Sequence, residues 1–443
     1  MAASAIVRRR TVFSIIGWLL FLLVAGIAWY SLLSVAVPAR VDFNGERGTV
    51  LGTFIPPFLL TLICWTGWRR LAPSATFART PAVANAEASS PVLAVAPLPK
   101  GRFRIGAWSV MTPQGDAAGT AERTKARETV FRPDKAIALE NGNPAHAGML
   151  ATLKLERAGY PATTRVRAPR VAVMLTGILD DILSRQISIP ETIEGPANVY
   201  WIVPRTLLVD EKFHIDIFEA AWRRSEWREH AYLLHIVPST PAAGYAIVSQ
   251  LQKGIDDSTL PYILVVAADS LLDSNELVLA EIFSIASPLG YIPAEGAAGF
   301  LLFNPAKSPQ GMWANSATLA PVIMMQFPPE QAAKDAAKTL SQAMAASISA
   351  GATSSADVKL VISDTDHRVQ GSMAVIGALA QVMNHLDPLE DRLCPMEYAG
   401  SFGAATDVIH LALAMEMATG DSQVVCVICN AHTQVASVLV LPA

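Results

Sequence analysis

Charged side chains are scarce in this chain. Only 16% of its 443 residues are Asp, Glu, Lys or Arg, whereas 52% are hydrophobic; an ordinary soluble domain carries about 25% charged residues. This composition excludes an intrinsically disordered protein. The first 70 residues hold seven basic and two acidic side chains, which leaves 27 basic and 36 acidic ones for the other 373. Because that larger part has no excess of positive charge, we expect no binding to nucleic acid.

Cysteine is also rare, and common catalytic motifs are missing. The four cysteines, Cys64, Cys394, Cys426 and Cys429, are too few and too unevenly spaced for a disulfide scaffold, which indicates a reducing compartment. The motifs G-x-S-x-G, G-x-x-x-x-G-K-[ST], G-x-G-x-x-G and H-E-x-x-H do not occur. The sequence therefore does not support a hydrolase, a nucleotide-binding protein or a zinc protease, and we expect no cofactor.

Two short clusters resemble metal ligands, but each has a simpler explanation. Cys426 and Cys429 fall on an expected strand, where residues three apart point to opposite faces and cannot hold one ion. Asp364, Asp366 and His367 follow another expected strand, where a solvated turn leading into a helix explains them. We therefore expect no metal.

Long uncharged runs, by contrast, open the chain. Val12–Val37 and about Val50–Trp68 lack charged side chains, and each is long enough to cross about 30 Å of hydrocarbon at about 1.5 Å per residue. We expect residues 1–70 to form a transmembrane hairpin. Arginines precede the first run and follow the second, which places both ends, and everything after residue 70, on the cytoplasmic side of the inner membrane. Residues 71–101, rich in Ala, Pro, Ser and Thr, predict a flexible linker.

Short β-rich runs alternate with amphipathic helical ones after the linker. This alternation is typical of a layered α/β body, which we divide into halves at residues 102–320 and 321–443. The expected strands are Phe103–Ser109, Arg170–Met174, Val199–Val203, Leu233–Val237, Tyr262–Ala267, Gly299–Phe303, Val322–Gln326, Val358–Ser363, Gln423–Cys429 and Ala436–Leu441. The expected helices are Phe213–Arg228, Gly244–Lys253, Glu330–Ala350, Gly371–His385 and Ala404–Thr419.

Six segments of the body carry, in order, motifs of one known family. They are Phe103–Gly115, Tyr262–Ser270, Gly290–Phe303, Gln342–Arg368, Cys394–Ala414 and Asn430–Leu441. Together they resemble the β-ketoacyl synthases. The resemblance implies the thiolase-like fold, in which two similar α/β halves form a five-layered core. It also implies a homodimer, formed in the family through the region of the strand Tyr262–Ala267.

The family's catalytic positions depart from its pattern. The resemblance implies a nucleophilic cysteine at a helix N-terminus, but the equivalent segment Pro238–Gly244 has none and offers only Ser239 or Thr240, which we expect to cap the helix. The two histidine positions fall on Asp364 and Gly400. Because all these positions differ together, the resemblance implies a catalytically degenerate relative without catalytic residues. Glu295 is expected to be a buried structural acid bonded to backbone amides.

One helical segment is a candidate surface for a partner protein. Phe218–Tyr232 contains Trp222, Arg223, Trp227 and Arg228, and Trp and Arg dominate binding hot spots. The alternative is a helix that buries its tryptophans against its own sheet.

The leading hypothesis is a non-catalytic adaptor, anchored in the inner membrane, that binds a partner protein from the cytoplasm. The layout of hairpin, linker and degenerate body resembles the lipase-adaptor proteins of bacterial type VI secretion, which implies a lipase effector and a spike protein as partners. The alternative is a membrane-bound acyl-chain binder or β-ketoacyl synthase-like acyltransferase. It requires an open apolar tunnel that ends near Ser239, Asp364 and Gly400.

Overall fold

The computed structural model describes residues 101–139, 142–193, 195–209, 211–254, 260–277, 281–284, 290–309, 312–313, 316–327, 335–431 and 434–443. The expected hairpin at residues 1–70 and all but the last residue of the expected linker lie outside these ranges. Among the helices that are described, none has the length and apolar character needed to cross a bilayer. The described residues all belong to one compact unit.

The first half of the body contributes five strands, a mixed half-sheet, to one 11-stranded sheet of the described chain. Its strands run in the order β1 (Phe103–Met111), β7 (Glu295–Phe303), β6 (Tyr262–Ser270), β4 (Ala197–Val203) and β5 (Tyr232–Pro238). β7 is antiparallel to both β1 and β6, whereas β4 is parallel to both β6 and β5. All residues of β6 and β7 are buried, as expected for strands covered on both faces.

The second half repeats this arrangement. Its strands run in the order β9 (Ile323–Gln326), β13 (Gln434–Leu441), β12 (Val424–Ala431), β10 (Val358–Ser363) and β11 (Arg392–Leu393). Here β13 is antiparallel to both β9 and β12, whereas β10 is parallel to both β12 and β11. The short strand β8 (Thr318–Leu319) pairs with both β1 and β13 and joins the halves. Two similar halves, as the family resemblance implies, are therefore present.

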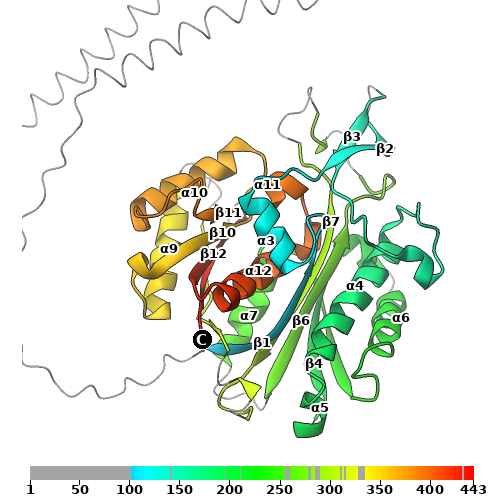
Figure 1. Ribbon diagram of the computed structural model, residues 1–443, viewed down its shortest axis with the longest axis horizontal. Helices are drawn as coiled ribbons and strands as arrows, with labels where there is room; N and C mark the ends of the chain where they lie inside the picture. Colours follow the sequence, from blue (N-terminus) through cyan, green and yellow to red (C-terminus); the bar gives the residue numbers. More distant parts are fainter. Residues whose placement is uncertain are drawn as a thin grey trace, which may run out of the picture. The chain divides into compact units, whose positions relative to one another are not determined.

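Three hydrophobic cores alternate with the two half-sheets to give five layers (Figure 1). The middle layer contains α3 (Ala117–Lys125), α7 (Ala243–Lys253) and α12 (Thr406–Gly420). α12 buries ten of its fifteen residues, which is typical of a helix enclosed between two sheets. One outer layer contains α4 (Arg167–Ser184) and α6 (Glu211–Trp222), and the other α9 (Ala336–Gly351) and α10 (Val369–Val382).

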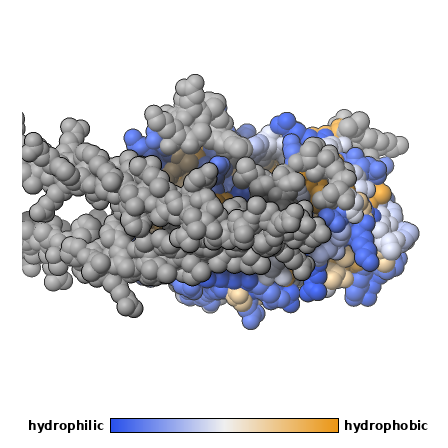
Figure 2. Space-filling model, turned by 90° about the horizontal axis from the view of Figure 1, so that it is seen from above, coloured by the Kyte–Doolittle hydropathy of each residue, from blue (hydrophilic) through white to orange (hydrophobic). Residues whose placement is uncertain are grey.

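Smaller elements complete the described chain. They are the hairpin of β2 (Arg132–Ala138) and β3 (Pro144–Ala147), the short helices α5 (Ile189–Thr192) and α11 (Pro395–Ala399), and the 3-10 turns η1 (Leu155–Ala158), η2 (Arg205–Val209), η5 (Ser355–Asp357) and η6 (Gly403–Ala405). Where the face shown in Figure 2 is not covered by grey atoms, hydrophilic residues predominate and hydrophobic ones are scattered among them.

Most expected strands and helices are present, but the strand predicted at Arg170–Met174 is wrong. These residues lie inside α4. The buried residues Val171, Met174, Leu175, Ile178 and Leu179 recur at helical spacing, so the short β-rich run is one part of a longer helical pattern.

Candidate functional site

The start of α7 occupies the position at which the resemblance places a catalytic cysteine. The residue before the helix is Ala242, which is 1% exposed and has left-handed backbone angles, φ 60° and ψ 25°. This conformation costs a residue other than glycine about 1–2 kcal/mol. Neither Ser239 nor Thr240 caps the helix with its side chain, so that prediction is wrong. Ser239 lies just after β5, where its N–H donates to Val203 and its carbonyl accepts from Arg205.

Two carboxylates from the other half of the chain reach this point instead. Asp407, in the first turn of α12, accepts a hydrogen bond from the Gly244 N–H, with an oxygen–nitrogen distance of 3.1 Å. Asp364, directly after β10, accepts from the Asn430 N–H at 2.8 Å. The Cys429 side chain lies beside both carboxyl groups, and the Ala242 backbone faces the Cys429 sulfur. The sequence predicted Asp364 at this position but missed Asp407.

Burial controls the protonation of this cluster. It raises the pKa of Asp407 to about 7, and the neighbouring charge of Asp364 adds to the rise. Burial likewise raises the pKa of Asp364, and it raises that of Cys429 well above the usual range for a thiol. Tyr245 is fully buried beside these groups, and its hydroxyl has no hydrogen-bond partner in the described part of the chain. Cys429 is thus a neutral thiol at physiological pH, and the thiolate is the nucleophilic form of cysteine.

Gly400, the second histidine position, has no room for a side chain. It follows α11 with φ 95°, a conformation that favours glycine. An added Cβ would lie 2.7 Å from the Ile292 carbonyl oxygen and 3.1 Å from the Ala294 Cβ. A histidine cannot stand here unless the backbone of the neighbouring segment moves.

The residues considered as metal ligands do not form a joint site. The Asp366 carboxylate binds the Arg368 side chain and backbone, whereas the His367 ring packs edge-on against Phe283, with ring centroids 5.0 Å apart. Within the described ranges, no group of three His, Cys, Asp or Glu side chains is arranged to hold a metal ion. Cys426 packs in the outer core under α9 and Cys429 in the middle core, so the prediction of opposite faces is confirmed.

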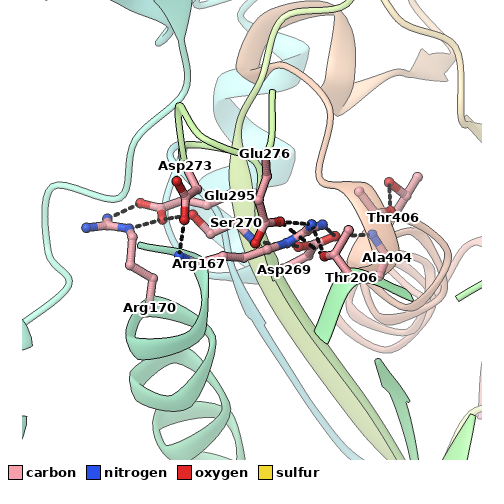
Figure 3. Close-up of polar contacts among 11 residues, drawn as sticks. Arg167, Arg170, Thr206, Asp269, Ser270, Asp273, Glu276, Glu295, Ala404 and Thr406 are labelled. Atoms are coloured by element: carbon pink, nitrogen blue, oxygen red, sulfur yellow. Dashed lines mark hydrogen bonds and ion pairs between the residues drawn. The ribbon is translucent and has the colours of Figure 1, made fainter. Parts of the chain in front are cut away.

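A buried ionic network lies between α4 and the ends of β6 and β7 (Figure 3). Glu295 is fully buried; it accepts from the Leu150 N–H at 2.7 Å and pairs with the Arg170 guanidinium. The prediction of a buried structural acid is confirmed; its partners are one backbone amide, the Arg170 guanidinium and the Ser270 hydroxyl, which donates at 3.1 Å. Asp269 binds Arg167 and accepts from the Ala404 N–H at 2.7 Å. The network therefore positions η6, from which α12 and its Asp407 continue.

The tryptophans of the predicted partner surface are in the core, and that part of the prediction is wrong. Trp222 and Trp227 are each 1% exposed, and their indole N–H groups donate to the His230 and Gln186 carbonyls. α6 ends at Trp222, after which the chain turns back toward β5. Arg223 and Arg228 are exposed and pair with the neighbouring glutamates Glu219 and Glu229.

Two hollows are present near other parts of the body. A groove of about 420 Å³ runs between α7 and β9, and a pocket of about 120 Å³ lies between the end of α3 and residues 389–398. Ser239, Asp364 and Gly400 line neither of them.

Comparison with known proteins identifies the fold. The sequence matches no protein-family model and no curated protein. Among solved structures, it is similar to the ishigamide ketosynthase/chain length factor, with 15% identity and a TM-score of 0.56 over 77% of this chain and 99% of that one. A β-ketoacyl synthase from Burkholderia phymatum shows 14% identity and a TM-score of 0.56, with the same shares covered. The body therefore has the thiolase-like α/β fold of the β-ketoacyl synthases.

Proposed function

We propose that this protein is a non-catalytic adaptor built on the thiolase-like fold. In this proposal the hairpin expected at residues 1–70 anchors it in the inner membrane, and the body binds a partner protein in the cytoplasm. The observation that carries the proposal is the carboxylate of Asp407 on the Gly244 N–H, at the position where a condensing enzyme needs a reactive thiolate.

Electrostatics supports the loss of acyl chemistry. A condensing enzyme stabilises a cysteine thiolate with a helix N-terminus and directs backbone N–H groups at the developing oxyanion. Here the equivalent segment Pro238–Gly244 has no cysteine, and Asp407 accepts from the first turn of α7. Asp364 accepts from Asn430, the residue that begins the family's closing loop. When these two carboxyl groups are ionised, they would repel an oxyanion at the reacting position instead of stabilising it.

The partner that we propose is a secreted lipase effector, which the adaptor would load onto a type VI secretion spike. Support for this finer proposal is the order of the expected elements, a membrane hairpin, a linker and a body that lacks the family's catalytic residues. A tethered binding module raises the effective concentration of its partner near a membrane machine without catalysing a reaction.

We also propose that the body forms a homodimer through β5 rather than through the strand at Tyr262–Ala267. β6, which contains that segment, is buried between β4 and β7. β5 is the terminal strand of its half-sheet, and its sequence YLLHIVP carries no Asp, Glu, Lys or Arg. Leu233 on this edge is 51% exposed. An uncharged, unpaired edge strand is a ready template for pairing with a second chain.

Co-purification tests the adaptor proposal. The full chain, extracted in mild detergent, should retain the lipase effector and the spike protein of its host when they are co-expressed. A lipase from the same host that is not secreted serves as the matched control and should not be retained. If neither protein is retained and an acyl carrier protein or a bound fatty acyl chain is recovered instead, the adaptor proposal fails in favour of acyl handling.

A further inference from the structure

The two outer helix layers differ sharply in charge. α4 and α6 together have 30 residues, of which eight are Asp, Glu, Lys or Arg. α9 and α10 also have 30 residues, and a single one, Lys338, is charged. Exposed faces of soluble proteins usually carry about 25–35% charged residues, and depletion of charge is typical of the core of a protein interface.

α10 is apolar on both of its sides. Its inner side, with Ala374, Val375, Ala378 and Leu379, packs in the outer core of the second half. Its outer side carries a second apolar row, which we call the α10 seam: Val369, Met373, Ile376 and Ala380. Val369 is 71% and Met373 59% exposed. Apolar rows on a helix are normally covered by a neighbouring element, and Val369 and Met373 of the α10 seam are not covered by any element of the described chain.

The spacing of the α10 seam specifies what kind of element covers it. Its members follow one another at intervals of four, three and four residues, which is the spacing of the contact positions in a helix that packs along another helix. Methionine is enriched in protein interfaces. Beside the seam, α9 presents only short or uncharged residues, Gln342, Ala345 and Ser349, after Lys338 in its first turn.

We infer that the α10 seam binds an amphipathic helix of a partner protein, whose contacting row is apolar and uncharged. Because Lys338 is the one charged residue of α9 and α10, a charged row would lose its hydration against most of this face without gaining an ionic partner. This inference rests on the proposed adaptor function and names the surface and chemistry by which the partner is held.

The size of the face distinguishes a transient partner from a permanent second copy. At about 1.5 Å per residue α9 is about 24 Å and α10 about 21 Å long, and two helices packed side by side span about 20 Å, which gives a face of about 450 Å². A stable protein interface covers about 800 Å² on each partner. The α9–α10 face is therefore suited to reversible binding, as an adaptor that releases its cargo requires.

Site-specific photo-cross-linking tests this inference. A benzophenone amino acid is placed at Met373 of the full chain in its native host, and at Ile215, an aliphatic residue on α6 that is 43% exposed, as the matched control. The expected result is a cross-link from position 373 alone, to a segment of another protein whose sequence has apolar, uncharged residues at helical spacing. A cross-link from 373 to a second copy of this chain, to lipid, or to nothing overturns the inference.

Charge substitutions provide a second arm. Met373→Glu and Val369→Lys each place a charge on an exposed position of α10 and should leave the fold intact, while reducing retention of the partner at least tenfold. Ile215→Glu should change retention of the partner less than twofold. If the partner is retained equally by all variants, the seam is not its binding site although the adaptor function stands. If the wild-type chain retains no partner, the adaptor proposal itself fails.

Discussion

Asp407 and Gly244 are 163 residues apart in sequence, yet the Asp407 carboxylate accepts a hydrogen bond from the Gly244 N–H at 3.1 Å. The contact joins two helices of the middle layer, α12 from the second half and α7 from the first. It places an acidic group on the end of α7 at which backbone N–H groups are free, where a carboxylate is favourable. The same carboxyl group has a pKa raised to about 7 by burial, so its charge varies near physiological pH.

Asp407→Asn should change how stability depends on pH. A carboxyl group whose pKa is higher in the folded state stabilises the fold at low pH, and this contribution is lost as pH rises from about 4 to the folded value of about 7. Relative to the wild type, the variant should gain about 1.4 kcal/mol in the free energy of unfolding for each pH unit across that range. Above pH 8 the difference should be constant. Urea unfolding of both proteins between pH 4 and 9 measures this difference in stability. A difference that does not depend on pH would contradict a raised pKa for Asp407.

His410→Leu should have the opposite effect. His410 is fully buried in α12, its ring nitrogens have no hydrogen-bond partner within the described residues, and burial lowers its pKa to about 3. The wild-type fold is therefore destabilised as pH falls from about 6.5 toward 3, because the unfolded chain binds a proton that the folded chain excludes. Relative to the wild type, the variant should gain about 1.4 kcal/mol for each pH unit below 6.5.

The double variant Asp407→Asn/His410→Leu checks both assignments together. The two slopes oppose each other between pH 4 and 6.5, so the double variant should differ from the wild type by a nearly constant amount in that range. A steep remaining slope would show that the pKa of Asp407 in the folded protein is not raised, or that the pKa of His410 is not lowered.

Arg170→Met should be among the most destabilising single substitutions in the body. It leaves Glu295, which is fully buried, without its cationic partner, and removal of one member of a buried ion pair costs about 3–5 kcal/mol. Adding Glu295→Gln, which removes the unpaired charge, should recover a large part of the loss. A double-mutant cycle by chemical denaturation measures the coupling; additive effects of the two substitutions would mean that the pair is not formed.

Leu233→Lys tests the proposed role of β5. A lysine on an exposed strand edge blocks pairing with a second chain, so the variant should be monomeric where the wild-type chain is dimeric. Light scattering after size-exclusion chromatography gives the mass in each case. The matched control is Ile187→Lys, which introduces the same charge at another exposed aliphatic residue, 55% exposed, and should leave the mass unchanged.

Much of the fold could be predicted from local patterns, because buried strands such as β6 carry a long apolar run, here Ile263–Ala268, before the polar residues Asp269 and Ser270 at the end of the strand. The helix containing Arg170 was missed because its first turns also read as a β-rich run. The partner surface at Trp222 and Trp227 was predicted wrongly because the sequence pattern does not show that α6 ends at Trp222. Acidic and basic residues continue up to Glu229, so a helix drawn through this whole segment would have an exposed side with both tryptophans and charged residues.

Less of the candidate site could be predicted from the sequence. Asp364 could be placed because it follows an expected strand within a family motif. Asp407 could not, since an acidic residue in the first turn of a helix is common and nothing in the sequence indicates contact with α7. The lack of room for a side chain at Gly400 could not be predicted either, because it is caused by the Ile292 carbonyl, more than 100 residues away in the chain.

An acyl-loading assay decides whether the centre of this fold performs acyl chemistry, which we propose it does not. The full chain is incubated with acyl-coenzyme A or acyl carrier protein carrying an acyl chain, and its intact mass is measured with Cys429→Ser as the control variant. We expect an unmodified mass for both proteins. A covalent acyl group on Cys429 that is absent from the control would contradict the proposal.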